Sequence, residues 1–252
     1  GGTAGEPILQ AENLVMRFGG LVAIDNVSMT LNRGEILGVI GPNGAGKTTI
    51  FNQISGFLKP TSGVTHIRSD DGRMLTPRAP DEFARSGVGR TFQIVQPFGK
   101  LTVIENIMIG ALMRHPALDD ARAAALRIAH LVGLYDLRDA EAGNLPIGDL
   151  KRLEVARTLA TEPRILLLDE VMAGQSQSDT NKMVEIIRAI RDTGVTVVAI
   201  EHNMQAIMNL SDRIVVIDSG KVIAEGDPST VVRDRRVIEA YLGEEFVNAQ
   251  GL

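Results

Sequence analysis

The 252-residue sequence contains no cysteine, which excludes disulfide bonds, thiolate catalysis and zinc–thiolate sites. No apolar run approaches the ~20 residues that a membrane-spanning helix needs. A basic excess is also missing: the formal net charge is −5, whereas general nucleic-acid binders are usually basic. Residues 1–5 lack the basic and apolar regions of a signal peptide, and we expect a disordered end or a cloning remnant there. These absences predict a cytoplasmic protein without a nucleic-acid partner.

What the sequence does contain is one glycine-rich stretch with a strand before it and a helix after it. Residues 36–40 form an apolar run typical of a buried strand, and residues 49–54 have helical character. The stretch between them matches the pattern G-x-x-x-x-G-K-[ST], which is credible only in such a strand–loop–helix context. The alternative, a chance glycine-rich turn that carries a lysine, is disfavoured by this context. The stretch predicts a nucleoside triphosphate site.

The chemistry of this site follows from its residue types. Glycines allow successive backbone N–H groups to point inward around a phosphate, and the helix N-terminus adds partial positive charge. Lys47 can reach the β- and γ-phosphates, and the Thr48 hydroxyl can bind Mg²⁺. The predicted nucleotide-binding residues of the stretch are Gly41, Asn43, Gly44, Ala45, Gly46, Lys47, Thr48 and Thr49.

Strands and helices alternate along most of the chain, which predicts an α/β fold with a mainly parallel sheet core. Antiparallel strands are expected at 8–17 with 22–31, and at 213–218 with 221–225 around a Ser219-Gly220 turn. Helical sequence is expected to dominate from Leu101 to about Ala160. Within it, a helix is predicted over 149–161 with Asp149 as its N-cap. A last helix is predicted over 231–242, ended by Gly243.

An apolar run, residues 165–168, ends in two acids, Asp169 and Glu170. In open α/β sheets ligands bind beyond the carboxyl ends of the strands, where these carboxylates would lie. Asp169 can hold Mg²⁺ through water, and Glu170 can polarise an attacking water as a general base. Alone, the pattern could equally be a solvated strand end. Together with the phosphate stretch, it predicts a hydrolytic site.

Three further features have ordinary explanations when taken singly. Gln93 lies in the run Arg90-Thr91-Phe92-Gln93, and could be a surface glutamine. Residues 145–149 lie at the start of a predicted helix, and could simply cap it. His202 follows a predicted strand over 195–200, and a hydrogen-bonded histidine at a strand end is the commoner case. The order of these three features along the chain, relative to the two nucleotide motifs, makes a functional role more plausible than these ordinary explanations.

That order resembles the ATP-binding subunits of ABC transporters, and the resemblance spans residues 8–242. It implies an ABC-type nucleotide-binding domain: a core of 8–92 and 162–230 with an antiparallel β part, a helical subdomain at 93–161, and a C-terminal helix at 231–242. It further implies that ATP and Mg²⁺ bind between two subunits closed head to tail. The roles implied are catalysis for Glu170, His202, Gln93 and Lys47; metal binding for Thr48, Gln93 and Asp169; adenine stacking for Phe18; and contact with the partner's ATP for Gly148.

Within that family, residues 90–93, 101–106 and 237–243 are most similar to an ATPase of the branched-chain amino acid importers. The implied partners are two membrane-spanning permease subunits, a second ATPase subunit in a homo- or heterodimer and, indirectly, a periplasmic solute-binding protein. The implied location is the inner face of the cell membrane. Alternatives are another ABC importer or exporter, a soluble factor acting on ribosomes or DNA repair, and a regulatory module that binds nucleotide without hydrolysis.

The chain departs from the family pattern in two motifs. In the signature, Pro146, Ile147 and Asp149 replace serine, glycine and glutamine. Val171 replaces the usual proline after Glu170. The loop of residues 173–176, the D-loop of the family, carries Gln175-Ser176 in place of an acid or asparagine. We expect the signature of this chain to bind a partner's γ-phosphate less tightly than the usual one.

Overall fold

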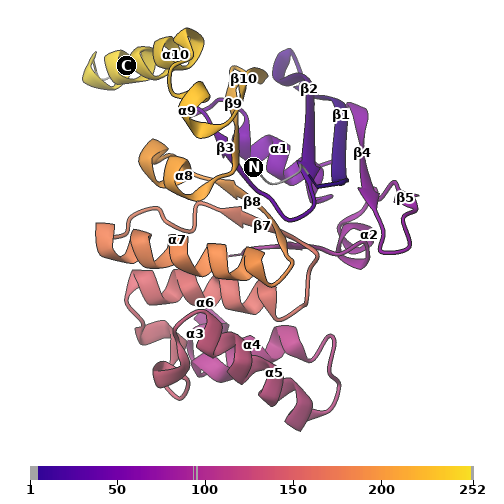
Figure 1. Ribbon diagram of the computed structural model, residues 1–252, viewed down its shortest axis with the longest axis vertical. Coiled ribbons are helices and arrows are strands. Elements are labelled where there is room, and N and C mark those ends of the chain that lie inside the picture. The colour runs from indigo at the N-terminus through magenta and orange to yellow at the C-terminus, as the bar shows by residue number, and fades with distance from the viewer. Residues whose placement is uncertain (1–4, 93, 95, 251–252) are drawn as a thin grey trace. The chain divides into compact units, whose positions relative to one another are not determined.

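The structure, a computed structural model, describes residues 5–92, 94 and 96–250 (Figure 1). It divides into two compact units. The first holds the described residues up to Ser86 and from Val198 onward, and the second holds Gly87–Val197. Over the described residues, none of the helices combines the length and the apolar character that a membrane span requires.

An antiparallel sheet in the first unit has the strand order β2-β1-β4-β5. Its strands are β1 Pro7–Phe18, β2 Leu21–Asn32, β4 Ser62–Arg68 and β5 Met74–Leu75. In β2, the side chains of Val27, Met29 and Leu31 are buried and alternate with more exposed polar residues. This period of two is that of a strand with one face on the core. The predicted hairpin of strands at 8–17 and 22–31 is confirmed.

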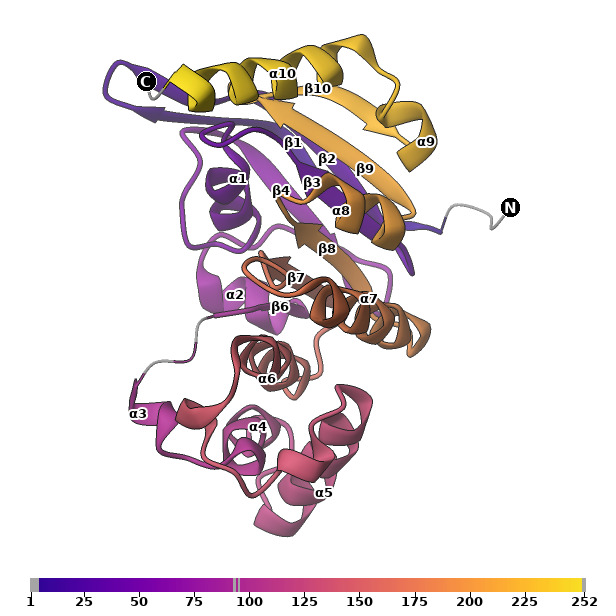
Figure 2. The same cartoon turned by 90° about the vertical axis from the view of Figure 1, so that its left-hand side faces the viewer.

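The first unit also contains parallel strands. β3 (Ile36–Ile40) pairs in parallel with β9 (Arg213–Asp218), and β9 pairs antiparallel with β10 (Lys221–Gly226). β8 (Thr196–Ile200) enters this unit from the second. Every residue of β3 and β8 is buried, as expected for strands covered on both faces. The helices of this unit are α1 Lys47–Ile54, α2 Pro80–Arg85, α8 Met204–Leu210, α9 Pro228–Val231 and α10 Arg235–Gln250, which lies along β10 (Figure 2).

The second unit joins a short parallel pair of strands to a helical cluster. The strands are β6 (Val88–Arg90) and β7 (Ile165–Asp169). The α-helices are α3 Gln96–Gly99, α4 Val103–Ala111, α5 Leu118–Leu131, α6 Ile147–Leu159 and α7 Gln177–Asp192, with 3-10 turns at Tyr135–Leu137 and Ala142–Asn144. A buried cluster from α4, α5 and α6 includes Val103, Ile107, Ala125, Leu153 and Ala156, so helix packing forms this core.

The predicted bounds of two helices are wrong. α6 begins at Ile147 with Pro146 as its N-cap residue, so Asp149 lies inside the first turn. Proline is tolerated at a helix start because the backbone N–H groups there have no intrahelical partner to lose. At the other end of the chain, α10 begins at Arg235 and not at residue 231, which ends α9, and it continues through Gly243 instead of stopping at residue 242. A helical glycine costs only about 1 kcal/mol relative to alanine, which is too little to end a helix by itself.

Candidate functional site

The phosphate-loop stretch joins β3 to α1 and is built against neighbouring backbone of the first unit. Gly46 is the N-cap of α1 and has a φ of 106°, which favours glycine. A Cβ added at Gly41 would lie 2.0 Å from the carbonyl oxygen of Ile217 at the end of β9. The Gly220 N–H donates to the carbonyl of Ala45 at 2.8 Å. The hairpin between β9 and β10 therefore holds this loop in shape.

We expect Gly41→Ala to destabilise the protein by about 1–3 kcal/mol, because the new methyl group meets a carbonyl that cannot rotate away. Gly20→Ala is the matched control, since a Cβ at Gly20 meets nothing within 4 Å and Gly20 has no positive φ. Chemical denaturation of both variants would check this. Equal stability of the two would contradict the packing described here.

Lys47 and His202, which are 155 positions apart in the sequence, lie together in the first unit. The Lys47 side chain is buried, its ammonium donates to the carbonyl of Gly41, and its Nζ lies 3.4 Å from Nδ1 of His202. His202 lies two residues after the end of β8, and Lys47 begins α1 after the loop that follows β3, so both lie beyond the carboxyl ends of sheet strands. The arrangement places a cation and an imidazole where a ligand of an open α/β sheet would bind.

Phe18 ends β1 at an exposed apolar hairpin tip. Its side chain is 49% exposed, and the neighbouring Leu21 and Val22 are exposed as well. The amide of the buried Gln53 in α1 donates to the carbonyl of Val15 in β1 at 3.3 Å, so this strand is fastened to the helix that follows the phosphate loop. An exposed ring in this position is available for stacking on a flat ligand.

In the second unit, Asp169 ends β7 and Glu170 follows it. Glu170 has a φ of 53°, in the left-handed region that is uncommon for residues other than glycine. Such a conformation costs about 1–3 kcal/mol, and strain of this kind is concentrated at functional sites. A bend at Glu170 and a turn over residues 171–174 follow, so the chain turns sharply after the strand. The backbone therefore presents two adjacent acids at the strand end.

Asp169 is held by two residues, Arg90 and Thr91, that were not among the predicted site residues. Nη2 of Arg90 lies 3.6 Å from Oδ2 of Asp169, and the Asp169 N–H donates to the Thr91 hydroxyl at 3.1 Å. Burial lowers the pKa of the Arg90 guanidinium, and the Asp169 charge opposes this change. Both residues stand in the run 90–93 that drew attention to Gln93. Gln93 itself lies outside the described residues.

The departures from the usual signature have local structural roles. Asp149 pairs with Arg152 one turn later, and Arg152 also donates to the carbonyl of Gly133 at 2.9 Å. Gly148 is buried, and a Cβ there would lie 2.7 Å from the carboxyl carbon of Asp179 in α7. The start of α6 therefore packs against α7. The pair of Asp149 with Arg152 stabilises the first turn of α6.

The D-loop residues also make contacts within the chain. The amide of Gln175 donates to the carbonyl of Val171. Ser176 is the N-cap of α7, and its hydroxyl accepts from the Asp179 N–H at 3.1 Å. Serine is a favoured N-cap residue. Both side chains thus shape the turn that connects Glu170 to α7.

The oxygen-bearing residues of the site suit a hard divalent cation. Among the described residues there is no cluster of three or more His, Cys, Asp or Glu side chains that could hold a metal ion. Mg²⁺ does not need such a cage, because it usually keeps several waters and binds one or two carboxylates together with substrate phosphates. A hydroxyl at Thr48 and a carboxylate at Asp169 fit that requirement. They stand in different units of the chain.

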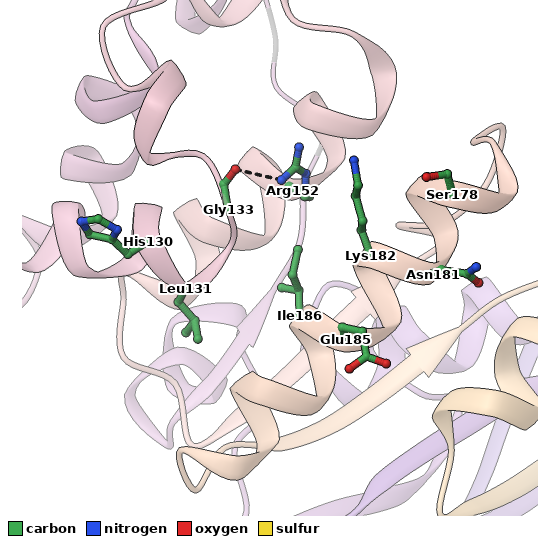
Figure 3. A pocket seen from close by; sticks show the side chains of 9 residues that line it. All are labelled: His130, Leu131, Gly133, Arg152, Ser178, Asn181, Lys182, Glu185 and Ile186. Carbon is green, nitrogen blue, oxygen red and sulfur yellow. Dashed lines mark hydrogen bonds between the residues drawn. The ribbon is translucent and has the colours of Figure 1, made fainter.

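A separate groove of about 760 Å³ lies on the second unit, between α5, α6 and α7 (Figure 3). None of its lining residues is among those predicted to bind nucleotide, and most are exposed. In Figure 3 the side chains of Lys182 and Ile186 on α7 point toward Arg152 and Gly133. The lining residues are His130, Leu131, Gly133, Arg152, Ser178, Asn181, Lys182, Glu185 and Ile186. The groove is therefore separate from the candidate nucleotide site, which consists of the phosphate-loop, Asp169–Glu170 and His202 residues.

Comparison with known sequences identifies relatives over nearly the whole chain. The chain is 42% identical to the high-affinity branched-chain amino acid transport ATP-binding protein LivG of Salmonella typhimurium, over 95% of this chain and 99% of that protein. It is 39% identical to BraF of Pseudomonas aeruginosa, which carries the same description, over 94% of this chain and 98% of that protein. A model of branched-chain amino acid ATP-binding cassette transporters matches residues 221–247.

Solved structures confirm the predicted fold class. The crystal structure of an ATP-binding cassette of an ABC transporter in its ADP conformation superposes with a TM-score of 0.85 at 33% identity, covering 94% of this chain and 99% of that one. The model of the ABC transporter family matches residues 24–173, more than half of the sequence. The chain therefore belongs to the ABC transporter family, as one of its ATP-binding cassettes.

Proposed function

We propose that this chain binds ATP with Mg²⁺ and hydrolyses it to drive import of branched-chain or related amino acids through partner membrane subunits. The observation that carries the proposal is the buried Lys47 ammonium of the phosphate loop, with its Nζ 3.4 Å from His202. The relatives named above, LivG and BraF, support the transport role. Phosphate release by the chain in membranes with its permease tests the proposal, and no release above a Lys47→Ala control would refute it.

Binding begins at the phosphate loop. The backbone N–H groups of residues 41–49 and the N-terminus of α1 surround the β- and γ-phosphates. Lys47 exchanges the carbonyl of Gly41 for phosphate oxygens, a stronger charge-assisted hydrogen bond. Phe18 stacks on the adenine from the tip of the β1–β2 hairpin. Thr48, Asp169 and Gln93 would hold Mg²⁺, which would supply charge neutralisation on the phosphates.

Hydrolysis then requires a water aligned with the γ-phosphorus. Glu170 accepts the proton of this water as its oxygen bonds to phosphorus and the bond to the ADP oxygen breaks. His202 and Gln93 position the water and the γ-phosphate. Arg90 and Thr91 keep Asp169 in place next to the base. The left-handed backbone at Glu170 sets the direction of its carboxylate.

In this proposal residues 8–242 form one ATPase domain. Residues 8–92 and 162–230 make the nucleotide-binding core, and residues 93–161 make the helical subdomain; the buried cluster of α4, α5 and α6 supports the latter assignment.

Two such domains close head to tail, so that Gly148 of one approaches the ATP of the other. ATP stabilises the closed dimer and hydrolysis releases it, which biases a two-state transporter.

The proposed assembly contains two membrane-spanning permease subunits and a second ATPase, at the inner face of the cell membrane, and receives solute from a periplasmic binding protein. Co-purification from membranes with the chain as bait tests it. Recovery of two hydrophobic subunits would support transport. Recovery of ribosomal or DNA-repair proteins would favour the rival classes. A chain that binds ATP without releasing phosphate in any assembly would be a regulatory module.

We expect the isolated chain to be largely monomeric without ATP, to dimerise weakly with ATP, and to hydrolyse slowly alone. A homodimer would build both sites with Pro146, which lacks a serine hydroxyl worth about 1.5–3 kcal/mol in a hydrogen bond to a charged group. Light scattering after size-exclusion chromatography, on the Glu170→Gln variant with and without ATP, measures this. Adding the cognate second ATPase and the permease should raise turnover well above the sum of the parts.

Pro146→Ser is the matched variant for this expectation. Serine is also a favoured N-cap, so α6 should begin at the same residue. ATP-dependent dimerisation of the isolated chain should tighten about tenfold or more. A tight, ATP-independent homodimer with full activity in the parental chain would contradict the heterodimer hypothesis.

A further inference from the structure

Glu154 in the middle of α6 is a charged residue buried in the second unit. Its side chain is 5% exposed, and it pairs with Lys151 at 3.4 Å one turn earlier. It also accepts a hydrogen bond from the backbone N–H of Ile94, the residue after Gln93. Burial raises the pKa of Glu154, and the charges of Lys151 and Arg157 oppose that rise only in part.

Two further side chains on the same face of α6 contact the same segment. The Arg157 guanidinium lies over the ring of Phe98, 4.6 Å from its centroid. The Thr158 hydroxyl lies 3.2 Å from the carbonyl of Arg90, to which it can donate. Residues 154, 157 and 158 have the i, i+3, i+4 spacing that shares a helix face. One face of α6 thus contacts residues 90, 94 and 98.

This contact connects α6 to the acidic end of β7. The segment from Arg90 to Phe98 starts with the two residues that hold Asp169, namely Arg90 by its guanidinium and Thr91 by its hydroxyl. A shift of α6 would move the Arg90 carbonyl through Thr158, and Arg90 would carry that shift to Asp169. The N-terminus of the same helix bears Gly148. The contacts therefore run from the signature end of α6 to the metal-binding acid.

We propose that Glu154 is a positioning residue for ATP hydrolysis, whose charged carboxylate holds Ile94 close to Arg90 and Thr91, the two residues that hold Asp169. This rests on the proposed ATPase function. A buried ion pair is often replaceable by neutral residues without loss of stability, so stability alone is a weak reason for this one. Charge strengthens the hydrogen bond to the Ile94 N–H, because charge-assisted bonds are about twice as strong as neutral ones.

The test is Glu154→Gln, which keeps the size and one acceptor oxygen but removes the charge. We expect kcat for ATP hydrolysis in the assembled transporter to fall about five- to tenfold, with KM for ATP within about twofold. The unfolding midpoint should fall as well, because the variant leaves the mostly buried Lys151 without its carboxylate partner. Activity is therefore compared at a temperature at which both proteins are fully folded, where a purely structural role would leave kcat at the parental value.

Two controls separate the possible outcomes. Glu185→Gln on α7 removes an exposed glutamate that pairs with Arg188 at 3.1 Å, also three residues along a helix, and should leave both kcat and midpoint unchanged. Thr158→Val removes the hydroxyl contacts to the backbone carbonyls of Arg90 and Glu154, leaves the Glu154 carboxylate in place, and should also lower kcat. Parental kcat in Glu154→Gln at a temperature at which both proteins are fully folded overturns this inference. An inactive parental transporter would overturn the proposed function instead.

Discussion

Replacing Lys47 with alanine is expected to abolish productive ATP binding. Lys47 is the single cation of the phosphate-loop motif, and its ammonium is already buried at the carbonyl of Gly41. Each hydrogen bond from a charged group to a phosphate contributes about 1.5–3 kcal/mol. Loss of contacts to both the β- and γ-phosphates should therefore weaken ATP binding by about 100-fold or more. Isothermal titration calorimetry with ATP and Mg²⁺ measures this directly.

The matched control for this variant is Lys59→Ala. Lys59 is an exposed lysine in the loop after α1, outside the motif, and its loss should leave ATP affinity unchanged. The circular dichroism spectra of both variants should match that of the parental chain. If Lys47→Ala binds ATP with parental affinity, residues 41–49 are not the phosphate site.

Glu170→Gln is expected to keep ATP binding and to slow hydrolysis by about 10²–10⁴-fold, the usual contribution of a positioned general base. The glutamine side chain has nearly the same shape but cannot accept the proton of the attacking water. Loss of the negative charge next to the γ-phosphate should also favour the closed, ATP-bound dimer. Single-turnover hydrolysis in the assembled transporter, with ATP affinity measured in parallel, tests both expectations.

Glu162→Gln is the matched control, because Glu162 is also a glutamate in the left-handed region, with a φ of 56° against 53° for Glu170. Any effect of the substitution on backbone strain is therefore shared by the two variants. Glu162 pairs with His115 at 2.6 Å and has no proposed catalytic role. Hydrolysis at the parental rate in Glu170→Gln would place the base elsewhere, with His202 as the next candidate.

The features predicted correctly from the sequence are those that local patterns determine. β3 occupies the predicted residues 36–40, and the phosphate loop follows it directly into α1, because loop and helix start are adjacent in the chain. The strand that ends in Asp169 was likewise evident from its apolar run. Backbone conformation and residue type act over a few positions here, so the pattern is sufficient.

The features that were missed depend on contacts distant in sequence. Thr91 holds the backbone of Asp169 only because β6 pairs with β7, and these residues are 78 positions apart. The burial of Glu154 could not be predicted either, because in the sequence Glu154 resembles an ordinary exposed residue of a helix. Asp149 was mistaken for an N-cap because aspartate is a common one, whereas its pairing with Arg152 holds it inside the helix.

ATP hydrolysis at the proposed site is tested by phosphate release from ATP by the chain assembled with its membrane subunits, compared in one buffer with the Lys47→Ala and Glu170→Gln assemblies. We predict steady, Mg²⁺-dependent release by the parental assembly and release near background in both variants, with ATP still bound by Glu170→Gln. Equal phosphate release by all three assemblies would contradict the account, because neither the phosphate loop nor the acidic end of β7 would then carry the hydrolysis.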